Sequence, residues 1–241
     1  MLKDTLFKIL DRIRADLYPD RCCFCFTPIE YQTDVCPDCR NTVKKIAGTR
    51  CLFCGASKDD CDCRSKKHFY NGITAPYIYD EKVRKGIIRW KYRNNIHALP
   101  FFARETANSI EESFTNIQFD AVTFIPQTEK EEDEKGMNQS ETLANEIGKH
   151  LKIPTVRMLK KITETERQHN LPLYKRSGNV FGVFSCIDYD TIKGKTILLI
   201  DDIKTSGNTL NECAKMLQLN DAAEVYCAVI AIAKKSGSSK K

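Results

Sequence analysis

One stretch, residues 195–210, constrains the fold more than any other part of the sequence. It begins with a continuous apolar run at residues 197–200, which predicts a buried strand of a parallel sheet. Asp201 and Asp202 follow this strand, and a loop rich in hydroxyl groups then turns sharply at Gly207. Residues 209–217 have the spacing of an amphipathic helix. Because helix N-termini attract anions, this order of features predicts a phosphate-binding site.

The same stretch resembles the phosphoribosyl-pyrophosphate (PRPP) loop of type I phosphoribosyltransferases, which joins an apolar strand, two acids and a hydroxyl-Gly-x-Thr loop. The alternative is an ordinary Rossmann-like strand with a polar turn. We favour the ligand site, since open α/β sheets bind ligands at the carboxyl ends of their strands. The resemblance implies PRPP-binding residues throughout the loop: Asp201, Asp202, Lys204, Thr205, Ser206, Gly207, Asn208 and Thr209. It implies that the two acids hold the ribose hydroxyls and Mg²⁺, and that the loop cradles the 5′-phosphate.

The cysteines form the second informative pattern, since nine of the twelve lie between Cys22 and Cys63. A Cys-x-x-Cys knuckle turns the backbone so that both thiolates reach one tetrahedral ion, and metal binding then supplies folding energy. Four short pairs predict one or two zinc sites with these ligands: Cys22, Cys25, Cys36, Cys39, Cys51, Cys54, Cys61 and Cys63. Cys23 is the spare residue.

The pairing of these ligands stays open at this point. Sequential pairing makes one site from the first two pairs and another from the last two, but an interleaved arrangement remains an alternative. The final pair has a single intervening residue, so we expect the second site to be the weaker. A redox role is less favoured, because no helix pattern directly follows a knuckle to lower a thiolate pKa.

Length, charge and composition restrict the number of domains, the kinds of partner and the location that we expect. The chain has 241 residues, which suits one large or two modest domains. Its net charge of +6 permits binding to phosphates or nucleic acid without demanding it. The N-terminus has no apolar signal region, and no run reaches the length of a membrane span. We therefore expect reduced thiols and a cytoplasmic location.

Periodicity and turn residues divide the chain into alternating elements. Helices are expected at residues 2–18, 81–93, 100–114, 138–151 and 209–217. Strands are expected at residues 77–80, 121–126, 155–159, 181–186, 197–200 and 223–232. Asn138 or Ser140 is expected to cap the fourth helix, residues 64–75 to form a linker, and residues 160–182 a functional loop. The order from residue 121 onward predicts a parallel sheet.

Four features together resemble the ComF family of competence-associated, phosphoribosyltransferase-like proteins, which includes GntX-type proteins. The first two are an apolar-Pro-x-x-Cys entry to the cysteine segment at residues 17–22, and an aromatic-Tyr-Asp strand at residues 77–80 with an Ile-x-x-x-Lys helix at 87–91. The others are a basic-Gly-x-Asn-Gln box at residues 135–139 and a long loop with Gln168, Leu171, Arg176, Asn179 and Phe184.

This resemblance implies an α/β fold, a type I phosphoribosyltransferase-like parallel sheet flanked by helices and preceded by a small zinc ribbon. The implied domains are an N-terminal helix (1–19), a double zinc ribbon (20–66), a phosphoribosyltransferase-like domain (67–234) and a disordered tail (235–241). It also implies a pyrophosphate loop and a lid that contain Pro126, Gln127, Lys135, Gly136, Lys160, Lys161, Lys175 and Arg176.

Two departures from the family pattern bear on which ligands and reactions the protein can support. An acidic run at residues 129–134 precedes the box, and it would repel pyrophosphate unless it swings into solvent. Thr205 stands where purine-salvage enzymes carry a general-base Asp, so purine salvage is not supported.

We therefore expect a protein that binds PRPP and Mg²⁺ and supports natural competence, by handling single-stranded DNA and contacting DNA-uptake proteins. The basic helix at residues 81–93 suits either a phosphate-tracking role or a solvated face. The alternatives are an active phosphoribosyltransferase with an unidentified acceptor and a PRPP sensor without turnover.

Overall fold

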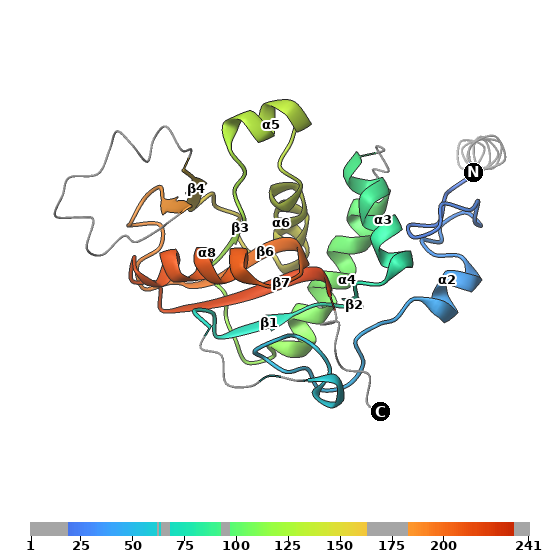
Figure 1. Cartoon of the computed structure of the whole chain (residues 1–241), viewed down its shortest axis with the longest axis horizontal. Coiled ribbons are helices and arrows are strands. Elements are labelled where there is room, and N and C mark those ends of the chain that lie inside the picture. The colour runs from blue at the N-terminus through green and yellow to red at the C-terminus, as the bar shows by residue number, and fades with distance from the viewer. Residues whose placement is uncertain (1–18, 62, 64–67, 93–96, 163–182, 234–241) are drawn as a thin grey trace, which may run out of the picture. The chain divides into compact units, whose positions relative to one another are not determined.

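The computed structural model describes residues 19–61, 63, 68–92, 97–162 and 183–233 (Figure 1). The expected helix at 2–18 and the expected tail lie outside these residues. Contacts divide the chain into unit 1 (Met1–Lys44 and Asp80–Phe101) and unit 2 (Lys45–Tyr79 and Phe102–Lys241). The cysteine-rich segment is therefore shared between the two units, and the domain boundaries drawn at residues 19, 66 and 234 stay predictions.

Unit 2 is built on a parallel five-stranded sheet. The strand order is β1 (Gly72–Thr74), β7 (Glu224–Ile232), β6 (Thr196–Lys204) and β3 (Ala121–Phe124), and β2 (Tyr77–Ile78) also pairs with β7. Every pairing is parallel, with Ile197 of β6 opposite both Val225 and Ala121. Continuous apolar runs form the long central strands because both of their faces are buried. The predicted parallel sheet is confirmed.

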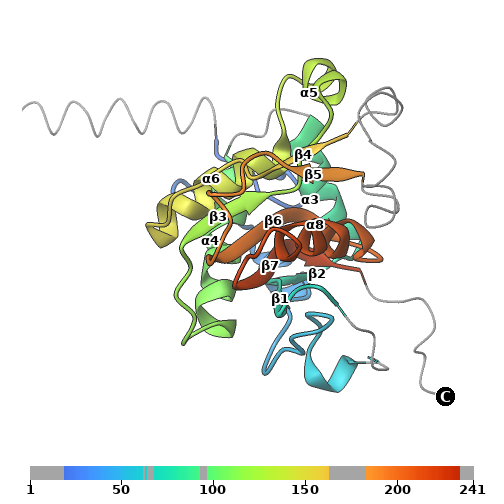
Figure 2. The same cartoon turned by 90° about the vertical axis from the view of Figure 1, so that its left-hand side faces the viewer.

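Helices cover both faces of this sheet (Figure 2). On one face, α8 (Asn208–Gln218) buries Leu210 and Leu217 in a core that includes Ile197 and Val225. On the other face lie α6 (Gln139–Leu151), against β3 and β6, and α4 (Ala98–Ser113), which begins in unit 1 and continues into unit 2. Here the Phe114 ring packs 4.9 Å from the ring of Tyr226, centroid to centroid.

Helices and strands agree with the sequence patterns wherever an apolar period is long. The basic helix is α3 (Glu81–Tyr92), and Asn138 is the residue that caps α6. Trp90 of α3 is buried. Among the described residues, no helix has both the length and the apolar character needed to cross a bilayer.

The expected linker at residues 64–75 is wrong at its end, because β1 lies within it. This strand has only three residues, too few to show a period, and all three are buried. Asn71 secures it to the sheet: its N–H donates to the Val225 carbonyl at 2.6 Å, and its side-chain oxygen accepts from the Val225 N–H at 3.0 Å. Long-range pairing therefore defines the strand.

The expected loop after β3 is also wrong, because α5 (Glu129–Lys135) forms within it. A capping box starts this helix: the Thr128 hydroxyl accepts from the Glu131 N–H, and the Glu131 carboxylate accepts from the Thr128 N–H. Gly136 ends it in the left-handed conformation. A helix with no apolar residue has no hydrophobic period, so only its caps could have predicted it.

The strand expected at residues 155–159 is displaced along the chain. Thr155 makes only an isolated bridge to Val122, and β4 (Leu159–Lys161) begins where the expected strand ends. β4 pairs antiparallel with β5 (Phe184–Cys186) in a separate two-stranded sheet. Residues 163–182, most of the expected lid, lie outside the described residues.

Candidate functional site

The acidic pair lies at the carboxyl end of the central strand. We expected the strand to end at Ile200, but β6 continues through Asp201 and Asp202 to Lys204. The reason is β7, a strand of the same length with a longer apolar run, which pairs with β6 as far as Lys204, opposite Ile232. The two carboxylates are therefore placed by a strand rather than by a loop, which fixes their backbone.

A serine of α6 holds the first of these carboxylates. The Ser140 hydroxyl donates to Asp201 Oδ1 at 2.9 Å, and the Asp202 N–H donates to the same oxygen at 2.9 Å. Ser140 is only 5% exposed, so water competes little for this bond. Sequence reasoning considered Ser140 only as a helix cap and missed this role. The clue was its position in the first turn of a helix that follows a neighbouring strand.

The first turn of α6 is itself tied to the sheet. Asn138 Oδ1 accepts from the N–H groups of Ser140 and Glu141 at 3.0 and 3.3 Å, while its Nδ2 donates to the Ile125 carbonyl at 3.1 Å. One buried side chain therefore joins the end of β3 to the start of α6. This bond places Ser140 beside the carboxyl end of β6.

The loop after β6 is polar and exposed between two buried anchors, Lys204 and Leu210. Gly207 has φ +81°, and a Cβ there would lie 3.0 Å from Lys204 Cε. The Lys204 stem therefore packs against the turn. Gly207 is also the N-cap of α8, and it has no side chain that could cap the first-turn N–H groups. The remaining predicted loop residues are exposed around this turn: Thr205, Ser206, Asn208 and Thr209.

The predicted pyrophosphate loop starts and ends at neighbouring side chains. Pro126 and Gln127 follow β3, and Gln127 Nε2 donates to Gln139 Oε1 at 3.1 Å. Between them, α5 ends at Lys135 and Gly136. Asp201 is held by Ser140, the residue after Gln139, so this loop and the acidic pair share one edge of the sheet.

The basic residues predicted for the lid are only partly described. Lys175 and Arg176 lie outside the described residues, and Lys160 is exposed on β4. Lys161 Nζ contacts both carboxylate oxygens of Glu131, at 2.9 and 3.0 Å. The acidic run is therefore partly neutralised within the protein, so it neither swings wholly into solvent nor faces an incoming anion with its full charge.

We expect the Glu131 contacts to make stability depend on pH. Hydrogen bonds from Thr128 and Lys161 lower the pKa of Glu131 from 4.5 to about 2. Because the folded pKa is the lower one, this stability is full above pH 4.5 and is lost as the pH falls towards 2. Glu131→Gln should cost about 1 kcal/mol at pH 7, allowing for solvent screening, and almost nothing near pH 2 in urea unfolding.

The control for this comparison is Glu134→Gln in the same helix, whose carboxylate lies 3.9 Å from Lys130 Nζ. An equal loss of stability in both variants, or a Glu131 effect that persists at pH 2, would contradict the assignment.

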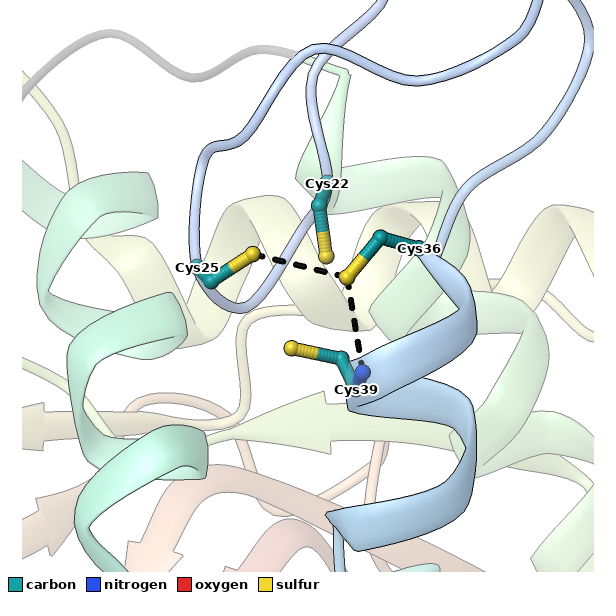
Figure 3. Close-up of side chains that lie close together, drawn as sticks. All are labelled: Cys22, Cys25, Cys36 and Cys39. Atoms are coloured by element: carbon teal, nitrogen blue, oxygen red, sulfur yellow. Dashed lines mark hydrogen bonds between the residues drawn. The ribbon is translucent and has the colours of Figure 1, made fainter.

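The first cysteine cluster lies in unit 1, and Figure 3 shows its four sulfur atoms turned toward a common centre. Its Sγ atoms all lie within 4.8 Å of one another, and two are 3.6 Å apart, those of Cys25 and Cys36. Helix α2 (Pro37–Thr42) starts after Cys36 and places Cys39, whose N–H donates to Cys36 Sγ at 3.4 Å. Cys23 is buried, and it is not part of the cluster.

The second cluster lies in unit 2 and joins the sheet. It comprises Cys51, Cys54, Cys61 and Cys63, with the short helix η1 (Lys58–Asp60) leading into the second pair. Two of its knuckle carbonyls accept hydrogen bonds at 2.9 Å. The Leu52 carbonyl accepts from the Ile73 N–H of β1, and the Phe53 carbonyl accepts from the hydroxyl of Tyr70, two residues before β1. The cysteines are grouped in the two sets of the sequential pairing rather than in the interleaved arrangement.

Both clusters fit zinc. A tetrahedral ion with Zn–S bonds of about 2.3 Å separates its sulfurs by about 3.8 Å. The separations here are 3.6 Å between Cys25 and Cys36 and 3.7 Å between Cys54 and Cys61, far longer than a disulfide bond. Burial raises the pKa of Cys25, but contacts with Thr27 outweigh it and lower the pKa to about 6. One thiolate ligand is therefore available near neutral pH.

Comparison with known proteins agrees with this architecture. Residues 137–241 match the model of the phosphoribosyl transferase domain, which spans α6 to β7 and includes the acidic pair. Competence protein ComFC of Bacillus subtilis is 26% identical over 206 residues, which cover 79% of this chain and 81% of that protein. Competence protein F of Haemophilus influenzae is 23% identical over 201 residues, which cover 79% and 87%.

Among solved structures, a glutamine PRPP amidotransferase from B. subtilis is similar at 21% identity and a TM-score of 0.43. The match covers 59% of this chain and 30% of that one. The fold assignment rests on the strand order and the domain match rather than on this likeness. The chain therefore contains a phosphoribosyltransferase-type domain and two cysteine clusters, and it is similar over most of its length to competence proteins of the ComF type.

Proposed function

We propose that this protein binds PRPP with Mg²⁺ at the carboxyl edge of β6, and that this binding supports natural competence. One observation carries the proposal: a glycine-capped helix, α8, follows directly after a strand whose acidic pair is held in place by Ser140. The first-turn N–H groups of such a helix attract a phosphate, and oriented carboxylates bind diols or Mg²⁺.

The parts of the ligand have distinct places in this proposal. The 5′-phosphate lies in the turn at residues 205–209, whose exposed hydroxyl and N–H groups can donate to it. Asp201 and Asp202 hold the ribose hydroxyls and share Mg²⁺ with the pyrophosphate. The pyrophosphate lies by Gln127 and Gly136, where Mg²⁺ supplies neutralising charge. Zinc in both cysteine clusters completes the protein, and a reducing cytoplasm keeps its ligand thiols available.

Ligand-induced stabilisation tests the binding claim. PRPP with Mg²⁺ at about 100 times its dissociation constant should stabilise the wild type by about 2.7 kcal/mol, and so raise its unfolding temperature. Asp201→Asn/Asp202→Asn should lose this rise, because the Mg²⁺ and ribose contacts are gone. The control is Asp190→Asn, an exposed acid in the turn before the amino end of β6. A rise that survives in the double variant would sink the assignment.

Ser140→Ala should weaken PRPP binding roughly tenfold with little loss of stability, because one hydrogen bond to a carboxylate is removed. The dissociation constant should become more sensitive to Mg²⁺ concentration, which a purely structural defect would not produce. Ser109→Ala is the matched control: it is a buried serine whose hydroxyl lies 2.7 Å from the Thr74 hydroxyl, away from Asp201. Equal effects in both variants would assign Ser140 a structural role only.

An active phosphoribosyltransferase is the second candidate function, and the intact acidic pair and loop favour it. Its acceptor is unidentified, and purine salvage is not supported because Thr205 stands in place of the general-base acid. Turnover would release pyrophosphate from PRPP with some acceptor and would stop in Asp201→Asn/Asp202→Asn.

The competence role is supported by the similarity of the chain to two competence proteins, ComFC of Bacillus subtilis and competence protein F of Haemophilus influenzae. In this proposal the protein handles single-stranded DNA during uptake, and the zinc-binding segments contact other uptake proteins. Normal transformation by a strain that carries the acidic-pair double variant would contradict a PRPP-dependent role in uptake.

A further inference from the structure

Phe26 adopts a backbone conformation that aromatic residues rarely take. It directly follows the second cysteine of the first knuckle and has φ +69°. Gly55 occupies the same place in the second knuckle, with φ +78°. Glycine adopts this conformation freely, whereas a bulky side chain there is an outlier. Phe26 is also 39% exposed, so burial in a core does not explain the choice.

Two arginines flank this ring. The guanidinium carbon of Arg21 lies 5.0 Å from the ring centroid of Phe26, and that of Arg89 lies 6.0 Å from it. Each guanidinium is anchored to the knuckle backbone, Arg21 to the Phe26 carbonyl at 3.3 Å and Arg89 to the Phe24 carbonyl at 2.5 Å. Neither has a carboxylate partner within the described ranges of the chain. Their positive charge is therefore held in place and left without a counter-ion among those residues.

The knuckle that carries Phe26 is firmly seated within unit 1. A Cβ at Gly86 of α3 would lie 2.7 Å from the Cys23 carbonyl, so only glycine permits this close approach. Phe24 is buried, and its ring packs edge-on against Phe101 with 5.5 Å between the centroids. The exposed ring and its two arginines therefore form a fixed surface.

The rest of α3 adds positive charge beside this surface, with four further basic residues and one acid. Lys85 lies one turn before Arg89 and Lys82 two turns before it, on the same side of the helix by their spacing. Both lysines are partly neutralised, Lys82 by Asp38 at 2.7 Å and Lys85 by Glu81 at 2.6 Å. The arginines at the ring are thus more available to an anion than these two lysines are.

We infer that Phe26, Arg21 and Arg89 bind single-stranded nucleic acid, with a base packed at the exposed ring and phosphates paired with the guanidiniums. An aromatic platform beside unneutralised arginines is the combination that binds single strands without sequence preference. An acidic protein segment would satisfy the arginines but would not require an aromatic side chain in a glycine conformation. The inference rests on the proposed role in handling DNA and names the surface that contacts it.

Fluorescence anisotropy with a labelled 20-nucleotide oligothymidine and the full-length, zinc-loaded protein tests the inference at several salt concentrations. Phe26→Gly should weaken binding at least fivefold without changing the salt slope, since one stacked base is lost. This variant removes the ring from a position that suits glycine, and Phe26→Tyr should restore the affinity. Arg21→Gln/Arg89→Gln should reduce the slope of log K against log salt by about 1.4, or about 0.7 for each phosphate that is no longer neutralised.

Two control variants make the same kinds of change, loss of an exposed ring and loss of two positive charges, away from the Phe26 surface. Phe53→Ala removes an exposed ring from the second knuckle, and Lys58→Gln/Lys193→Gln removes the same net charge from exposed positions of unit 2. Zinc content and unfolding temperature confirm that each variant is folded. We expect both controls to bind the oligonucleotide within about twofold of the wild type, because neither removes a stacked base.

Three results would overturn the inference: no oligothymidine binding by the wild type, no larger effect of the Phe26 and arginine variants than of the controls, or equal displacement by polyglutamate. The last result would assign the surface to acidic protein partners. PRPP-induced stabilisation should be normal in Phe26→Gly. A protein that binds DNA through Phe26 but does not respond to PRPP would refute the proposed function while leaving this inference intact.

Discussion

Replacing Cys51 by Ser should remove one of two bound zinc ions and lower the unfolding temperature by about 10 °C. A structural zinc contributes most of the folding free energy of its own segment, and a loss of about 3–5 kcal/mol shifts a domain of this size by that amount. The effect should reach the sheet, because Gly55 of the same knuckle packs against Ile73 and Ile232. Zinc is measured by elemental analysis and unfolding by calorimetry.

Cys186→Ser is the matched control, since it removes a half-buried thiol of unit 2 that belongs to neither cluster. It should retain two zinc ions per chain and shift the unfolding temperature by only a few degrees. If Cys51→Ser also retained two zinc ions, or if the purified wild type under reducing conditions contained none, the zinc assignment would be refuted.

Gly207→Val should abolish detectable PRPP binding. Valine is strained at φ +81°, and its Cβ would press on the Lys204 stem, so the turn must change shape. The first-turn N–H groups of α8 then move away from the phosphate position. We expect at least a 100-fold loss of affinity, together with a destabilisation of about 1–3 kcal/mol from backbone strain.

Gly194→Val separates these two effects. Gly194 has φ +70° and no atom within 4 Å of an added Cβ, and it lies in the turn before the amino end of β6. This variant should lose similar stability from strain and keep its PRPP affinity. If both variants lost affinity equally, the effect of Gly207 would be one of global stability, and the turn would not be the phosphate site.

Sequence patterns predicted the elements that are determined by residues close together in the sequence. The strands β3, β6 and β7 contain continuous apolar runs, and the spacing of the cysteine pairs predicted one or two clusters of cysteines, of which the structure has two. Asn138 was predictable as a cap because its side chain bonds locally, to N–H groups two and three residues away. The Gly207 turn was predictable because few other residues adopt a positive φ.

The remaining features depend on partners that are distant in sequence. β1 exists because β7 supplies its hydrogen bonds, and the acidic pair lies within β6 for the same reason. The bond from Ser140 to Asp201 joins residues 61 positions apart, and that from Lys161 to Glu131 joins residues 30 apart. No local pattern encodes such contacts. The sequence therefore predicted that the acidic run is a loop that repels pyrophosphate, whereas the run forms a capped helix in which Glu131 contacts Lys161.

The most direct test of the central claim is a calorimetric titration of the zinc-loaded wild-type protein with PRPP in the presence and absence of Mg²⁺. The proposed function predicts saturable heat with one PRPP bound per chain, and affinity that rises with Mg²⁺ because Asp201 and Asp202 would share the ion with the ligand. Ribose 5-phosphate should bind more weakly at the same turn. The absence of saturable heat, or heat that is unchanged in Asp201→Asn/Asp202→Asn, would contradict a PRPP site at the end of β6.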